Sequence, residues 1–222
     1  MGDAVQLLFD AIPSLLGTPV GDLEDLASGQ VALAGYFCDN LCRPAPGQRY
    51  LARQLRYASR PCDAPANVLD LGDVNVFPLE PEKHFAAVAS QCMSVLGSGA
   101  RLVLVGGDKS GAKALVTAAQ QAADGEVQEV SLTGADCSAG TAPIVLSVDL
   151  DELAGNWLSR PHRPSGLTPA QMIARIGDIP GNIVGAALFG MAPALDSRGT
   201  TETRAALAIL RALADRLGKR AS

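Results

Sequence analysis

The sequence predicts an α/β fold in which a mostly parallel sheet is covered by helices on both faces. Short aliphatic runs, such as Val31 to Gly35 and Arg101 to Val105, are typical of strands that are buried on both faces. Segments with helical spacing of apolar residues alternate with these runs along the chain. Aromatic residues make up only 4% of the sequence. This low aromatic content, together with abundant Ala and Gly, suits close packing of helices on a sheet.

The expected strands and helices follow one another in regular alternation, so we expect a three-layer α/β/α sandwich. One helix has a clear start signal, because Thr168 can act as its N-cap and Pro169 suits its first position. Asp196 has the place of a cap before the last helix. The strands are expected at residues 31–35, 68–74, 101–105, 126–132, 144–150 and 183–189, and the helices at 49–59, 81–96, 111–123, from 169 onward, and 201–217.

Length and composition favour one domain and exclude several classes of protein. At 222 residues, with 48% hydrophobic and 18% charged residues, the chain is long enough for one well-buried domain. We expect a single domain over residues 1–222, with a helical N-terminal lead-in at residues 1–28. The formal net charge of -5 offers no basic field for nucleic acid. Neither a signal-peptide pattern nor an apolar run of about 18 residues is present, so we expect a cytoplasmic protein without membrane spans.

Two aspartates, Asp149 and Asp151, follow an apolar run at the end of the strand expected at 144–150. Alternate residues of a strand face the same side, so the two carboxylates would share a face. Such a pair at the carboxyl end of a buried strand is a good place for a divalent metal ion. Alternatively, the aspartates cap the strand end and pair with a Lys or Arg side chain. The pattern alone leaves both interpretations open.

The cysteines and histidines give weaker signals. Cys38 and Cys42 form a C-x3-C pair, but no second Cys or His pair follows at zinc spacing, so we expect buried free thiols. His84 lies at a helix start and is expected to be a solvated polar residue. His162 lies in a Pro-His-Arg-Pro loop, where it is either simply exposed or a substrate-contacting acid or base.

A series of short motifs follows in order along the chain. The segments are Gly35–Asp39 (compare Gly-x-Pro-x-Asp), Pro46–Arg49 with Leu55–Ser59 (Pro-Gly-x-Arg, then Ile-Arg-x-x-Ser), Asp70–Val74 (Asp-x-Gly-Asp-Val), Gly106–Ser110 (Gly-Gly-Asp-His-Ser), Asp149–Asp151 (Asp-x-Asp), and Gly166–Thr168 with Pro193. This series resembles the motifs of the ureohydrolases, the family of arginase and agmatinase. The resemblance covers residues from about 31 to 213 and implies the arginase-like sandwich.

The departures from the family pattern that matter most fall on metal ligands. Members of the family hold two manganese or nickel ions through a His, an Asp-Ala-His-x-Asp motif and the Asp-x-Asp pair. In this chain Lys109 replaces the first His, Ala154 a later Asp and Gly190 a later Glu. The Asp-Ala-His-x-Asp motif is absent, and residues 111–146 are too few for the segment that carries it, so the active-site region is shortened. Only Asp149 and Asp151 remain as candidate ligands.

The resemblance therefore implies a vestigial metal site made of Lys109, Asp149, Asp151 and Gly190. Two carboxylates from one strand cannot close a binuclear site, and a charged Lys cannot bind a metal because it has no acceptor. We expect no catalytic residue and no metal or other cofactor in this chain. One hypothesis is that the Lys109 ammonium replaces the metal by neutralising Asp149 and Asp151, because a buried acidic pair without a cation would be costly.

Members of the family form trimers and hexamers. We therefore expect a chain that keeps the fold but lacks the metal ligands to be a non-catalytic subunit of such an assembly. The chain would assemble with a metal-dependent (Ni or Mn) paralogue that hydrolyses a guanidine- or biguanide-type C-N bond. Heteromeric hydrolases of the metformin hydrolase type are the nearest resemblance. Two alternatives stay open: a stand-alone pseudoenzyme that binds a small cation through Asp149 and Asp151, and a divergent hydrolase with one metal ion on Asp149, Asp151 and a further ligand such as His162.

Overall fold

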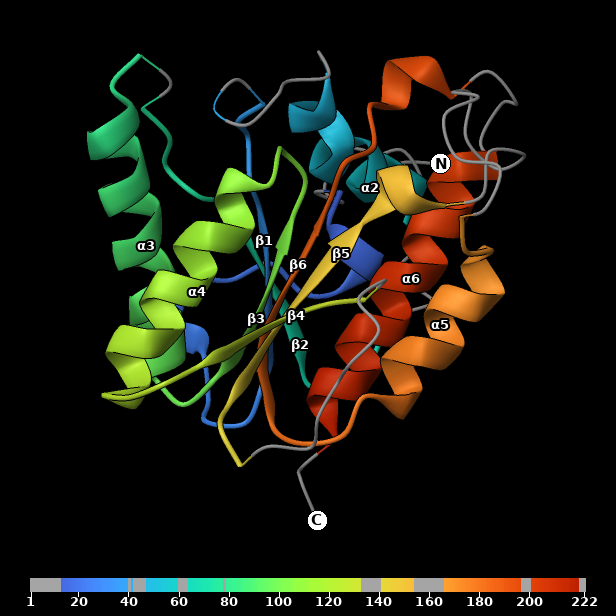
Figure 1. Cartoon of the computed structure of the whole chain (residues 1–222). Coiled ribbons are helices and arrows are strands. Elements are labelled where there is room, and N and C mark those ends of the chain that lie inside the picture. The colour runs from blue at the N-terminus through green and yellow to red at the C-terminus, as the bar shows by residue number, and fades with distance from the viewer. Residues whose placement is uncertain are drawn as a thin grey trace, which may run out of the picture.

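One sheet of six parallel strands forms the centre of the molecule (Figure 1). Its strand order is β2-β1-β3-β6-β5-β4. The strands are β1 (Val31–Gly35), β2 (Val68–Asp73), β3 (Arg101–Val105), β4 (Gln128–Ser131), β5 (Ile144–Asp149) and β6 (Ile183–Phe189). This computed structural model describes residues 13–39, 41, 47–59, 64–77, 79–132, 141–153, 166–196 and 201–219.

Helices cover both faces of the sheet, which gives the predicted three-layer sandwich. Helices α3 (Pro81–Gly97) and α4 (Ser110–Ala123) lie on one face (Figure 1). Helices α2 (Leu51–Ala58), α5 (Pro169–Asp178) and α6 (Thr201–Gly218) lie on the other. Within the residues that the structure describes, no helix is both long and apolar enough to cross a membrane.

The side chains of each central strand pack into two hydrophobic cores, because they alternate between the two faces of the sheet. In β1, Val31 and Leu33 pack into the core beneath α2, α5 and α6. Ala32 and Ala34 pack into the core beneath α3 and α4. All four are buried, which explains why the strand appears in the sequence as a continuous apolar run rather than as an alternating one.

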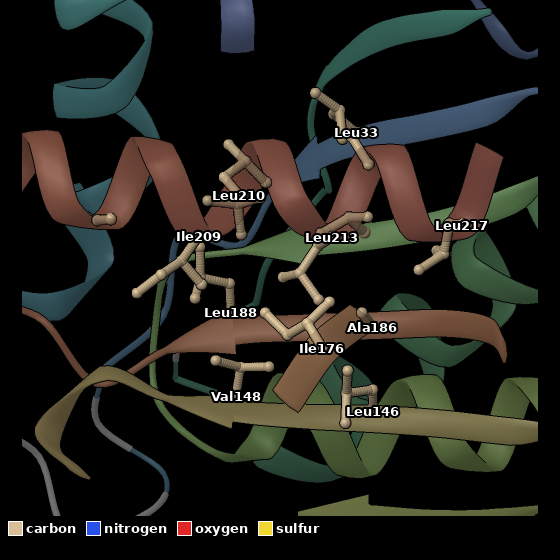
Figure 2. Packing of buried hydrophobic residues seen from close by; sticks show 14 of the residues in the cluster. Leu33, Leu146, Val148, Ile176, Ala186, Leu188, Ile209, Leu210, Leu213 and Leu217 are labelled. Atoms are coloured by element: carbon tan, nitrogen blue, oxygen red, sulfur yellow. The ribbon is translucent and has the colours of Figure 1, made fainter. Parts of the chain in front are cut away.

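Helix α6 shows how the second layer is held. Its residues Ile209, Leu210, Leu213 and Leu217 recur at helical spacing and are fully buried. Figure 2 shows these side chains among residues of the strands and of α5, including Leu33, Leu146, Ile176 and Leu188. Burying a side chain of this size contributes about 1.5–3 kcal/mol relative to leaving it exposed. The face of α6 therefore accounts for much of the stability of this layer.

Several expected boundaries are confirmed and others need correction. Strand β6 has the expected bounds, and Thr168 caps α5 by accepting a hydrogen bond from the Gln171 amide at 3.2 Å. Asp196 caps α6 in the same way, accepting from the Thr203 amide at 3.2 Å. The N-terminal lead-in is different: residues 1–12 lie outside the described part of the chain, and residues 13–28 contain two 3-10 turns, Leu15–Gly17 and Leu23–Asp25, instead of a helix.

Candidate functional site

An open pocket of about 520 Å³ lies where strands β3, β5 and β6 end. Ligands of parallel α/β proteins bind in this position, outside the carboxyl ends of the strands. All four vestigial positions predicted from the sequence line this pocket. The lining residues are Leu41, Gln48, Asp108, Lys109, Lys113, Asp149, Asp151, Phe189 and Gly190. The fold therefore brings together residues that are up to 149 positions apart in the sequence, from Leu41 to Gly190.

The two aspartates of the Asp-x-Asp motif do not share a strand face, which corrects the sequence prediction. Strand β5 ends at Asp149, and a 3-10 turn over Leu150–Glu152 begins there. Asp149 caps this turn, because its Oδ1 atom accepts a hydrogen bond from the Asp151 amide at 2.9 Å. Asp151 lies within this turn, and its Oδ2 atom lies 3.5 Å from the Gln48 Nε2 atom. The strand period therefore does not extend to the second aspartate.

Gly190 follows β6 and faces the Asp149 carboxylate closely. Its φ angle is +95°, in the left-handed region that glycine adopts without strain. A Cβ atom at this position would lie 2.1 Å from Asp149 Oδ1 and 3.1 Å from the Asp151 amide nitrogen. The Asp149 carboxylate thus lies where a side chain at position 190 would begin. A glutamate could not replace Gly190 unless Asp149 moved.

Gln48 lies at the base of the pocket and was not recognised in the sequence. It is only 5% exposed, and its Nε2 atom donates to the Gly190 carbonyl at 2.8 Å, in addition to its long contact with Asp151. It begins the 3-10 turn Gln48–Tyr50, which leads directly into α2. The only signal for Gln48 was its variable place in the Pro-Gly-x-Arg motif, which does not specify a role.

Lys109 lines the pocket with an exposed side chain. No hydrogen bond or ion pair joins its ammonium to Asp149 or Asp151, all three of which are described. The direct contact expected from the sequence is therefore not formed. The pocket lining holds the carboxylates of Asp108, Asp149 and Asp151 together with the ammonium groups of Lys109 and Lys113. The opposite charges share one open, solvated space.

These residues do not fit the metal pair of the ureohydrolases. Asp149 already accepts a backbone hydrogen bond and packs against Gly190, and Lys109 has no lone pair to offer while it is charged. Across the described residues, no group of three or more His, Cys, Asp or Glu side chains is placed to hold a metal ion. Ala154 and His162, the other positions considered for ligands, lie outside the described residues.

Asp108 is a second pocket residue that the sequence did not single out. It is 2% exposed and its Oδ2 atom accepts from the Leu41 amide at 2.9 Å. Its Oδ1 atom accepts from both the amide, at 2.9 Å, and the hydroxyl of Ser110. It lies in the glycine-rich turn after β3, where Gly107 has φ +69°. A Cβ at Gly107 would lie 2.4 Å from the Cys38 carbonyl oxygen, so this close approach requires glycine.

The structure also corrects the interpretation of His84. The sequence predicted a solvated residue at a helix start, yet His84 is 1% exposed, in the first turn of α3. Its Nε2 atom is 2.7 Å from the Tyr36 hydroxyl oxygen, and burial lowers its pKa. Of the cysteines, Cys38 and Cys92 are buried free thiols as predicted, and burial raises the pKa of Cys92 to about 12. Cys42 lies outside the described residues.

Comparisons with known proteins agree with this architecture. Residues 29–133 match the model of the arginase family. The structure is similar to proclavaminate amidino hydrolase from Streptomyces clavuligerus, with a TM-score of 0.77 and 17% sequence identity over 93% of this chain and 97% of that chain. No curated protein sequence matches the chain significantly.

Two further solved structures have the same fold. A hypothetical agmatinase from Burkholderia thailandensis has a TM-score of 0.76 at 20% identity, over 94% of this chain and 90% of that chain. Formimidoylglutamase from Bacillus subtilis has a TM-score of 0.73 at 14% identity, over 92% of each chain. Identities this low establish the fold alone, and the match to the arginase-family model covers residues 29–133.

Proposed function

Given its arginase-like fold and the supported membership in the ureohydrolase superfamily, we propose that this chain is a non-catalytic subunit of a hydrolase complex. It assembles with a metal-dependent paralogue that hydrolyses a guanidine- or biguanide-type C-N bond. The paralogue carries the nickel or manganese ions and the chemistry of a metal-bound hydroxide. This chain contributes an interface that stabilises or completes the site of its partner.

The observation that carries this proposal is the packing of Asp149 against Gly190. The carboxylate accepts a hydrogen bond from the Asp151 amide and lies where a side chain at position 190 would start. Asp149 thus serves as the cap of a turn and occupies the space that a side chain at position 190 would need. Such a side-chain-to-backbone bond is a structural use for a carboxylate that does not require a metal ion.

Other segments that resemble the family keep their structural contacts, which supports a role that depends on the fold. Arg56, in the segment that resembles Ile-Arg-x-x-Ser, donates from Nε to Asp70 at 2.9 Å and from Nη1 to Asp73 at 2.6 Å. Asp70 is only 1% exposed, so this cluster is a buried structural element. A chain that keeps such motifs while its metal ligands differ is consistent with a role that needs the fold and not the reaction.

Co-expression tests the proposal directly. The chain would be produced with an affinity tag, alone and together with a ureohydrolase-like protein encoded next to it. Metal content, urea release from guanidine and agmatine, and dimethylamine release from metformin would be measured for each chain and for the purified complex. We expect metal and activity to accompany the paralogue and to rise when the complex forms. Turnover and stoichiometric metal in this chain alone would refute the proposal.

A second candidate is a stand-alone pseudoenzyme that binds a small organic cation. The specific observation in its favour is the pocket of about 520 Å³, which three carboxylates line. Lys109 and Lys113 line the same pocket and oppose a cationic ligand, which is why we rank this function second. Calorimetric titration of the isolated chain with agmatine and guanidine distinguishes the two, since only the pseudoenzyme binds without a partner. Asp151→Asn would then weaken the binding.

A further inference from the structure

A chain of hydrogen bonds links the loop after β2 to the floor of the pocket. The Phe77 amide donates to His84 Nδ1 at 3.1 Å, and His84 Nε2 lies 2.7 Å from the Tyr36 hydroxyl oxygen. The Tyr36 hydroxyl lies 2.6 Å from Ser110 Oγ, which in turn bonds to the Asp108 carboxylate. Tyr36, His84, Ser110 and Asp108 are each at most 5% exposed. These four side chains are therefore buried, while the Phe77 end of the chain is only partly buried.

Only one arrangement of protons satisfies every link. A backbone amide can only donate, so His84 Nδ1 accepts from Phe77 and the imidazole proton lies on Nε2. Nε2 then donates to the Tyr36 oxygen, and the Tyr36 hydroxyl donates to Ser110 Oγ. The Ser110 hydroxyl donates to the ionised Asp108 carboxylate at the end of the chain. A neutral His84 with its proton on Nε2 is the state that this geometry requires.

We propose that His84 is an acid-sensitive latch: its protonation releases Phe77 and the loop between β2 and α3, and the change is transmitted through Tyr36 and Ser110 to Asp108 in the pocket. A protonated imidazole carries hydrogens on both nitrogens. Its Nδ1–H would then point at the Phe77 N–H, two donors facing each other at 3.1 Å. The imidazole can keep Tyr36 as an acceptor, so Phe77 is the partner that has to leave.

The loop has a second attachment, which does not titrate. Gln91, on α3 like His84, accepts from the Asn75 amide at 2.9 Å and donates to the Asn75 carbonyl at 3.2 Å. The Val74 amide also donates a hydrogen bond to the Gly35 carbonyl at 2.9 Å. Loss of the bond to His84 therefore frees the Phe77 amide, while the first half of the loop stays in place and the Phe77 carbonyl still accepts from the Glu80 amide at 3.0 Å. Leu79 is 93% exposed and offers no packing to resist a local change.

The charged and titratable neighbours of His84 favour this behaviour. Asp108 is the nearby charge that raises the His84 pKa, yet burial has the larger effect and the pKa lies below its usual value of 6.5. Burial raises the pKa of the neighbouring Tyr36, so its hydroxyl stays neutral beside His84. Glu80 and Lys83 neutralise each other at 3.3 Å on the exposed side, and the Lys83 ammonium lies over the Phe77 ring.

The sign of the pH dependence follows from the lowered pKa. Because the folded state holds His84 neutral, the unfolded or released state binds more protons below pH 6.5. The latch is thus fully closed above pH 6.5 and weakens as the pH falls from that value toward the folded pKa. Protection of the Phe77 amide against hydrogen exchange should fall by up to about tenfold per pH unit within this window.

NMR spectroscopy of the whole chain tests the proposal. The sequence contains only two histidines, so the His84 imidazole can be assigned with His84→Gln as reference. We expect the Nε2–H tautomer at pH 7.5 and a titration midpoint below 6.5. The Phe77 and Ser110 amide resonances should shift with that same midpoint. If the Ser110 amide shift does not follow the His84 titration, the proposed coupling from His84 to Asp108 is wrong. If His84 carries its proton on Nδ1 at pH 7.5, the latch itself is wrong, because Nδ1 could not accept from Phe77.

Three variants separate the latch from other acid effects. Tyr36→Phe removes the middle link, so Phe77 should still titrate with His84 while the response at Ser110 is lost. Glu80→Gln should leave both midpoints unchanged, which excludes the Glu80 carboxylate as the source. Gln91→Ala frees Asn75 without altering the Phe77 midpoint, because Gln91 holds the same loop but does not titrate. If Tyr36→Phe fails to fold, the wild-type titration alone still decides the outcome.

Discussion

Two pairs of aspartates lie at the ends of parallel strands, and the fold treats them differently. Asp70 and Asp73, in β2, share one guanidinium, because Arg56 bonds to both and also to the Gly72 carbonyl at 2.7 Å. The other pair, Asp149 and Asp151 at the end of β5, has no Lys109 contact of this kind. Asp149 caps a backbone turn by accepting from the Asp151 amide, and Asp151 contacts Gln48.

The difference shows which part of the family motifs a scaffold needs. Within the first pair, Asp70 is buried and would be costly without its cation, whereas the Asp73 side chain, which shares the same guanidinium, is 46% exposed. The second pair lies in an open pocket, where water and backbone donors can solvate it. We therefore expect substitutions at the second pair to affect stability less than loss of the cation at the first pair. Three substitutions measure this contrast.

Arg56→Met should have the largest effect. The side chain of Arg56 is 13% exposed and that of Asp70 is 1% exposed, so the substitution leaves a buried carboxylate without its cation. Breaking a buried pair in this way costs about 3–5 kcal/mol of unfolding free energy, measurable by urea denaturation. Arg211→Met is the matched control, because the Arg211–Asp215 pair is exposed, and it should cost at most about 1 kcal/mol. Equal losses for the two variants would contradict the contrast.

Gly190→Ala should have an intermediate effect. The new Cβ would lie 2.1 Å from Asp149 Oδ1 at a φ of +95°, and residues strained in this way cost on the order of 1–3 kcal/mol. Asp149→Ala combined with Gly190→Ala should recover part of the loss, since the clash disappears and only the backbone strain remains. Gly177→Ala, in α5 with nothing within 4 Å, is the control and should stabilise the protein by about 0.5–1 kcal/mol. Strictly additive losses in the double variant would show that the two residues do not compete for space.

Lys109→Met should have the smallest effect, below about 0.5 kcal/mol, because the side chain is exposed and makes no ion pair with the aspartates. Thermal unfolding of this variant and of Lys113→Met, which lines the same pocket, gives the comparison. A loss above about 1 kcal/mol for Lys109→Met alone would revive the hypothesis that its ammonium neutralises Asp149 and Asp151.

Most of the fold was predictable because local signals agree with the packing. The aliphatic run of β6 and the Thr168-Pro169 start of α5 both determine their elements within a few residues. The Asp-x-Asp geometry was not predictable in the same way. Strand periodicity predicts a shared face for Asp149 and Asp151, but β5 ends one residue before Leu150 and a turn begins. Where a strand ends depends on the hydrogen bonds of its neighbours, which a local pattern does not contain.

The role of His84 was hidden for a related reason. A polar residue in the first turn of a helix is usually solvated, and nothing near it in the sequence suggests Tyr36 or Ser110 as a partner. The three residues come from the end of β1, the start of α3 and the start of α4, and only the sheet order brings them together. The glycines of the turn after β3 were visible as a motif, but the approach of Tyr36 and Cys38 that requires them was not.

Metal titration of the isolated chain tests the central claim most directly. The purified protein would be stripped with a chelator, incubated with excess Mn²⁺ or Ni²⁺, desalted, and measured by elemental analysis and native mass spectrometry. Our account predicts well under one bound ion per chain, with no change after Asp149→Asn, because the pocket residues do not fit a metal pair. Two ions per chain that disappear in Asp149→Asn would contradict the account and identify this chain as a metal-bearing hydrolase.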